Sequence, residues 1–163
     1  MPFTPFHLGP ALLFGLLLFP HLDLPTFLVS NVIVDLEPFL VLALGLRWPL
    51  HGPFHSYTLG TLVALGTALL MLLMMPLTRP LTSLFRLPQD SSPRKVAVTS
   101  LLGLYLHLTL DAFLYPEMNL LYPLKGNPLL GLASLHAVYQ FCTLCFPLAL
   151  LLYLYRLLRP RRG

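Results

Sequence analysis

Apolar residues fill five long stretches of the chain, and segments rich in polar residues or proline separate them. A membrane-spanning helix needs about 20 consecutive apolar residues. The last three stretches meet this length with few or no charges, and each is predicted to form a membrane helix. The second contains two carboxylates and a proline, which favours a span or a pair of half-helices, and the first is short, which favours a tilted or re-entrant helix. The five stretches are residues 8–20, 24–46, 56–78, 96–115 and 129–155.

The composition is that of a membrane protein. Hydrophobic residues make up 56% of the 163 residues and charged residues 10%, with a mean hydropathy of +0.78. A soluble domain carries about 25% charged residues, so this chain cannot cover its apolar surface with charge. The 17 prolines and 10 glycines favour short or interrupted helices. We predict an all-α integral membrane helical bundle in the cell membrane, with four to five membrane helices, some short or broken, that forms a single domain over residues 1–163.

Basic residues predict the orientation in the membrane. Most of them gather in two clusters, one between Arg79 and Lys95 and one from Arg156 to Arg162. Basic segments stay on the cytoplasmic side of a membrane, and the two clusters are two predicted spans apart, so both are placed there. No basic face with interleaved aromatic residues is present, which excludes nucleic-acid binding. The first basic residue is Arg47, so no cleaved signal peptide is expected.

Two pairs of ionisable residues lie near the predicted extracytoplasmic face. His107 and Asp111 are four positions apart in the fourth stretch, so they share one helix face. An ionisable pair inside a membrane helix is costly and indicates a functional site; the alternative is a hydrogen bond that only locks helix packing. His51 and His55 have the same spacing in the turn before the third stretch, where they can chelate one metal ion or two neighbouring ions.

The second stretch contributes two carboxylates, Asp35 and Glu37. Glu37 precedes Pro38, which disfavours the α conformation, and in an extended segment positions i and i+2 point to the same side. We therefore predict a helix break that aims both acids at one site, with a capped kink as the alternative. His7, at the start of the first stretch, is predicted to join them as a ligand, although a lone histidine there also suits a helix cap.

Seven residues are therefore candidate metal ligands, which is more than the roughly four that one zinc ion takes. Two or more divalent ions are predicted, with zinc favoured because histidine mixed with carboxylates suits zinc hydrolytic chemistry. Asp35 is the candidate general base, and Asp111 is the second candidate catalytic residue. His21 and Asp23 are instead predicted to form a solvated turn on the opposite side. The candidate ligands are His7, Asp35, Glu37, His51, His55, His107 and Asp111.

The order of these residues resembles a family of membrane-bound metal-dependent hydrolases whose bacterial member is named for its regulation by LexA. That family has an early histidine, a Pro-Asp-x-Asp motif, a His-Arg-Gly run that leads to His-Ser, and a His-x-x-x-Asp motif followed by Thr-Pro and Leu-Leu-x-Pro. The chain departs from this pattern at Val34 and Glu37 in the second motif and at Gly52 and Pro53 in the third. The matching positions are His7, Asp35, Glu37, His51, His55, Ser56, His107, Asp111, Tyr115-Pro116 and Leu120-Leu121-Tyr122-Pro123.

This family is similar in turn to the zinc phospholipase C and nuclease superfamily, an all-α fold with a multi-metal site, which implies phosphoester hydrolysis. We therefore predict a membrane-embedded, zinc-type metal-dependent hydrolase of a phosphoester or lipid-like substrate, which uses water activated by the metal. Its expected partners are the lipid bilayer and that substrate, and its site is expected to face the extracytoplasmic side. Two alternatives stay open: a metal-binding transporter or scaffold without catalysis, and a di-iron membrane oxygenase. The oligomeric state is not predicted.

Overall fold

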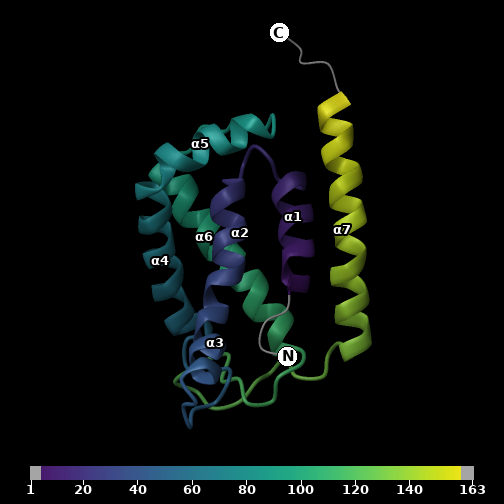
Figure 1. Cartoon of the computed structure of the whole chain (residues 1–163). Helices are drawn as coiled ribbons and strands as arrows, with labels where there is room; N and C mark the ends of the chain where they lie inside the picture. Colours follow the sequence, from purple (N-terminus) through teal and green to yellow (C-terminus); the bar gives the residue numbers. More distant parts are fainter. Residues whose placement is uncertain (1–4, 159–163) are drawn as a thin grey trace.

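The structure, a computed structural model, describes residues 5–158 and consists of helices without strands over that range (Figure 1). This confirms the all-α prediction. Most of the helices run along a common axis, whereas α5 lies across one end of the bundle. In chain order, the elements are the 3-10 turn η1 (Pro5–His7), α1 (Leu8–Leu17), α2 (Leu24–Val32), the 3-10 turn η2 (Ile33–Asp35), α3 (Leu36–Ala43), α4 (Tyr57–Leu73), α5 (Met75–Leu84), α6 (Pro93–Ala112) and α7 (Leu135–Leu158).

Two helices of the described chain are long and apolar enough to cross a membrane, which indicates membrane association. One is the continuous helix Leu24–Ala43, formed by α2, η2 and α3, and the other is α7. Helices α4 and α5 are bent by 75° at their junction and make a third span if the pair is counted as one. Helix α6 has 20 residues but does not meet the same criterion. The prediction of four to five membrane helices is therefore not confirmed.

The helix Leu24–Ala43 tightens into the 3-10 turn η2 near its middle. Asp35, at the end of η2, has φ −64° and ψ −10°, and Glu37 lies in the first turn of α3. The predicted extended segment is therefore wrong. Pro38 is accommodated because the first turn of a helix does not need the N–H that proline lacks. On helical backbone, positions i and i+2 diverge, so the two carboxylates point in different directions.

Helix α6 lies at the centre of the bundle. It packs against both α2 and α4, while α1 packs against α7. Gly103 permits the close approach of α6 to α2, because a Cβ atom there would collide with Ser30 Oγ and with the backbone oxygen of Phe27. The inward face of α6 is buried as a result, including the side chains of His107 and Asp111.

The two ends of the bundle differ in what they carry. One end has η1, α3 and the loops 44–56 and 113–134, and the other has α5 and the turn between α1 and α2 (Figure 1). At the second end, the buried Asp23 carboxylate accepts hydrogen bonds from the Thr26 backbone N–H (3.0 Å) and from the Ser91 hydroxyl. The predicted solvated turn is therefore correct for His21, which is exposed, and wrong for Asp23, which caps α2.

Candidate metal centre

Four buried side chains from three segments meet at the end of the bundle that carries η1 and α3. Asp35 ends η2, His55 lies in the loop 44–56, and His107 and Asp111 lie on α6. Each offers one ligand atom, and these atoms all lie within 4.8 Å of one another. The four residues, which we name the central group, could therefore bind a metal ion.

Helix ends hold two members of the central group in place. His55 directly precedes Ser56, whose side chain caps the first turn of α4. Asp111 lies in the last turn of α6, where the Asn127 side-chain amide donates to the carbonyl oxygen of Ala112 (2.6 Å). Both helix ends therefore have partners for backbone groups that the helix itself cannot satisfy, and the adjacent ligands lie on ordered backbone.

His107 lies between the two carboxylates of the central group. Its Nε2 atom is 3.0 Å from Asp111 Oδ2 and 3.4 Å from Asp35 Oδ1. The predicted shared helix face of His107 and Asp111 is therefore confirmed. His55 Nε2 is buried and has no hydrogen-bond partner within the described chain. An unpartnered buried nitrogen is unfavourable, but its lone pair is what a metal ion requires, so the donor set fits a divalent cation.

Glu37 contacts the central group through His55. The His55 Nδ1–H donates to Glu37 Oε2 (2.7 Å), and Glu37 Oε1 accepts a longer hydrogen bond from the Phe54 backbone N–H (3.4 Å). A carboxylate on one imidazole nitrogen fixes the ring and leaves the other nitrogen to bind metal. Glu37, predicted as a metal ligand, instead contacts the Nδ1 side of the candidate ligand His55. The helical backbone of α3 turns Glu37 away from Asp35.

His51 has the same arrangement with a different acid. Its Nδ1–H donates to Glu117 Oε1 (2.8 Å), and its Nε2 lies 3.9 Å from Asp111 Oδ2. The ring stacks on Tyr115 with centroids 3.8 Å apart. Burial lowers the pKa of His51 below its ordinary value, although the hydrogen bond with Glu117 opposes this shift. The candidate ligands did not include Glu117, although it follows soon after His107 and Asp111 in the sequence.

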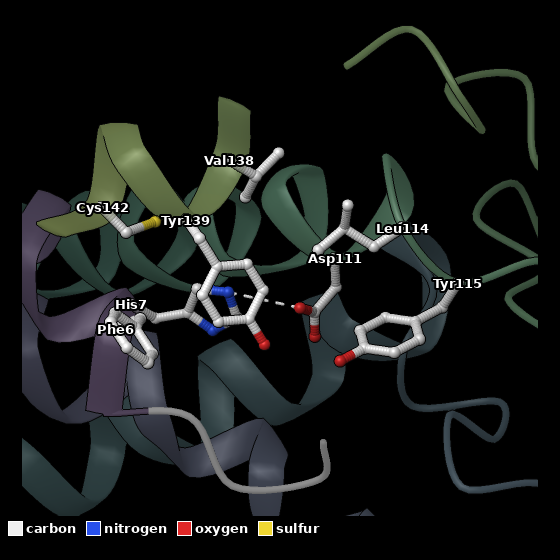
Figure 2. A pocket seen from close by; sticks show the side chains of 8 residues that line it. All are labelled: Phe6, His7, Asp111, Leu114, Tyr115, Val138, Tyr139 and Cys142. Atoms are coloured by element: carbon white, nitrogen blue, oxygen red, sulfur yellow. Dashed lines mark ion pairs between the residues drawn. The ribbon is translucent and has the colours of Figure 1, made fainter. Parts of the chain in front are cut away.

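His7 approaches Asp111 from the start of α1. Its Nε2 lies 3.2 Å from Asp111 Oδ1, the contact drawn in Figure 2. Its ring also meets the edge of the His107 ring, with centroids 4.2 Å apart. The structure therefore brings all seven predicted ligands into one cluster. Four form the central group, and the other three, His7, Glu37 and His51, each contact a member of it.

A small pocket lies beside His7 and Asp111 (Figure 2). Its volume is about 10 Å³, which is close to the space that one water molecule occupies. Tyr139 and Cys142 of α7 form part of its wall, and Tyr115 borders it near Asp111. Neither tyrosine was a candidate site residue, because aromatic residues are frequent in apolar helices and loops; Tyr115 was noted only as part of the family motif. The pocket offers room for a water against the Asp111 carboxylate.

Comparison of the chain with protein-family models, with curated proteins and with solved structures finds no match. The chemistry of the site is therefore inferred from its own side chains. Those side chains are nitrogen and oxygen donors that are buried, close together and backed by further carboxylates. This arrangement could bind a divalent ion; it does not by itself specify the identity or the number of ions.

Proposed function

We propose that this chain is a membrane-embedded metal-dependent hydrolase that acts on a phosphoester or lipid-like substrate. The observation that carries the proposal is the central group, in which buried imidazole and carboxylate donors lie within 4.8 Å of one another. The unpartnered His55 Nε2, fixed from behind by Glu37, supports a metal ligand rather than a packing residue. The resemblance of residues 7–123 to membrane-bound metal-dependent hydrolases favours the same reaction class.

Two divalent ions fit the cluster better than one. Asp111 Oδ2 lies near His107 within the central group, whereas Asp111 Oδ1 lies near His7. One ion would be held by the central group, and a second by His7 and the shared Asp111 carboxylate. His51, whose Nε2 lies 3.9 Å from Asp111 Oδ2, is close enough to serve either ion. Histidine and carboxylate ligands together suit zinc, which we propose as the metal.

The chain's own residues supply the orientation and the proton transfer. Bound divalent ions would polarise a phosphoryl oxygen and lower the pKa of water toward about 7. Asp35, buried at the edge of the central group, is the proposed general base and accepts a proton from the attacking water as the new P–O bond forms. Protonated Asp35 would return this proton to the alcohol oxygen as the bond from that oxygen to phosphorus breaks. Glu37 and Glu117 hold the rings of His55 and His51 in a fixed orientation by hydrogen bonds during the reaction.

We further propose that α1 and α6 cross the membrane beside the longer apolar helices, which gives four to five spans. Arg79 lies in α5, Arg94 lies near the start of α6, and Arg86 lies in the segment between these helices. This part of the chain is at the end of the bundle opposite the central group (Figure 1). Arg156 lies near the end of α7 at that same end. Basic segments stay in the cytoplasm, so the central group would face the extracytoplasmic side.

Metal content and hydrolysis together test this function. The full chain, purified in detergent without added metal, is analysed by elemental mass spectrometry and assayed with bis(p-nitrophenyl) phosphate and with a phospholipid. We expect bound zinc and release of p-nitrophenol or of a lipid fragment. His107→Ala and Asp111→Asn should lose both, whereas His136→Ala, at an exposed position, should keep both.

Other results would overturn the proposal. Bound iron with visible absorption would favour a di-iron oxygenase. Bound metal without hydrolysis of either probe would favour a transporter or scaffold. Full turnover in both His107→Ala and Asp111→Asn would show that the central group is not catalytic.

A further inference from the structure

A large apolar cavity lies at the end of the bundle opposite the central group. Its volume is about 940 Å³, which is at the upper end of the range for small-molecule sites, about 300–1,000 Å³. Helices α1, α2, α4, α5 and α7 all contribute to its walls. The cavity is separate from the metal centre, and its role does not depend on hydrolysis.

The described residues that line the cavity offer no free polar side chain to bind a polar ligand. Among residues 5–158, no charged side chain lines the cavity, and the hydroxyl groups in its lining come from Thr78, Thr82 and Tyr153. Each of these hydroxyls already donates to a backbone carbonyl oxygen, of Met75, Arg79 and Phe85 respectively. The part of any ligand that lies inside the cavity must therefore be hydrocarbon.

The cavity reaches the outer surface of the bundle. Several of its lining side chains are exposed, including Leu81 at 53%, Phe85 at 52% and Leu150 at 57%. These residues belong to α5, its C-terminal end and α7, and α7 is one of the helices able to span a membrane. A lipid acyl chain could therefore enter from a surrounding bilayer without passing through water.

The rim beside α5 is basic. Arg79 is adjacent to the lining residue Thr78, and Arg86 lies between the lining residues Phe85 and Leu87; both arginines are exposed. Arg86 also has φ 58°, in the left-handed region where glycine or asparagine is far less strained. Strained backbone of this kind is found at functional sites, which supports a role for the Arg86 side chain. The charge of the rim complements an anionic headgroup.

We propose that the cavity binds an acyl chain of an anionic membrane phospholipid, whose phosphate lies against Arg79 and Arg86. Helix α5 lies across the end of the bundle, bent by 75° from α4 (Figure 1). Arg79 in α5 and Arg86 just after it are next in sequence to residues that line the cavity. Apolar burial provides the affinity, and the two arginines provide selectivity for negative charge. The binding site is formed by this chain alone and contains none of the candidate metal ligands.

Native mass spectrometry of the detergent-purified full chain tests this site. The probes are palmitoyl-oleoyl phosphatidylglycerol, phosphatidylcholine with the same chains, and free oleate. We expect one retained phosphatidylglycerol, bound roughly tenfold or more tightly than phosphatidylcholine, because two basic side chains attract its net negative headgroup and phosphatidylcholine is zwitterionic. Equal retention of the two phospholipids, or stronger retention of oleate, would overturn the headgroup assignment.

Variants of the chain separate the acyl pocket from the basic rim. Leu28→Trp fills the cavity and should abolish retention, whereas Leu62→Trp, on an exposed face of α4 outside the cavity, should not. The pair Arg79→Gln and Arg86→Gln should remove the preference for phosphatidylglycerol but keep chain binding.

Further variants complete the test. Arg94→Gln is the matched control for the two rim arginines and should leave the preference unchanged. Ala149→Leu, which fills the cavity from α7, provides a second filling variant if Leu28→Trp does not fold. Undiminished retention in a folded filling variant would overturn the proposal.

Discussion

Glu37→Gln is expected to weaken metal binding without removing a metal ligand. The Glu37 carboxylate accepts the His55 Nδ1–H at 2.7 Å, and its side chain is only 11% exposed. Such a carboxylate orients the imidazole and raises the basicity of its other nitrogen, and its loss lowers metal affinity about 10- to 100-fold. This corresponds to about 1.4–2.8 kcal/mol of binding free energy. Glutamine has nearly the same volume, so the fold should be retained.

The affinity is measured by competition with a chelator of known zinc affinity in detergent solution. The melting temperature of the metal-free protein provides the control for folding and should change little. Asp90→Asn, which removes an exposed carboxylate at the other end of the bundle, is the matched control variant and should bind metal normally.

A double-mutant cycle decides whether Glu37 acts through His55. If it does, Glu37→Gln should have little further effect in the His55→Ala background, because the ring that it orients is absent. If Glu37 itself binds the metal, the two losses of free energy should add. Additive losses would refute the placement of Glu37 behind His55.

Three further variants and one change of conditions test the same structure. Glu117→Gln should lower metal affinity less than Glu37→Gln, because the Glu117 side chain is 36% exposed and solvent screens its charge; the same chelator competition compares them. Gly52→Ala should also weaken metal binding, because its Cβ would displace the Glu37 carboxylate, whereas Gly66→Ala meets open space and should not. Gly103→Val should lower the free energy of unfolding by about 1–3 kcal/mol, measured by chemical denaturation in detergent. Metal at 100 times its Kd should stabilise the fold by about 2.7 kcal/mol, so an unchanged melting temperature after chelation would count against a bound ion.

Local spacing made part of the site predictable. His107 and Asp111 are four residues apart on one helix, and this spacing alone places them on one face. The approach of His7, His51 and His55 followed from counting predicted membrane crossings, which placed the ends of several segments at one face. That of Asp35 was predicted from a helix break beside Pro38. Which segment ends meet at one face depends on the direction of each segment and on the length of its apolar stretch. Both can be predicted from a sequence.

The remaining features depend on tertiary packing. The role of Glu37 was not predictable because Pro38 fits into the first turn of α3, which changes the direction of the carboxylate. Asp23 was mistaken for a solvated residue because its partner Ser91 is 68 residues away. The predicted number of membrane spans is not confirmed, because α4 ends at Leu73 in a 75° bend rather than continuing through its apolar stretch.

Charge balance favours the two ions that we propose for the candidate site. When ionised, Asp35, Glu37, Asp111 and Glu117 place four negative charges in one cluster. Asp35 and Asp111 are buried, whereas the Glu117 side chain is 36% exposed. Buried charge is strongly unfavourable unless opposite charge compensates it, and imidazolium ions or bound cations would do so here. Protonation of His55 at Nε2 would leave a buried N–H without an acceptor in the described structure. Two divalent cations would balance the four carboxylates and use that nitrogen as a ligand.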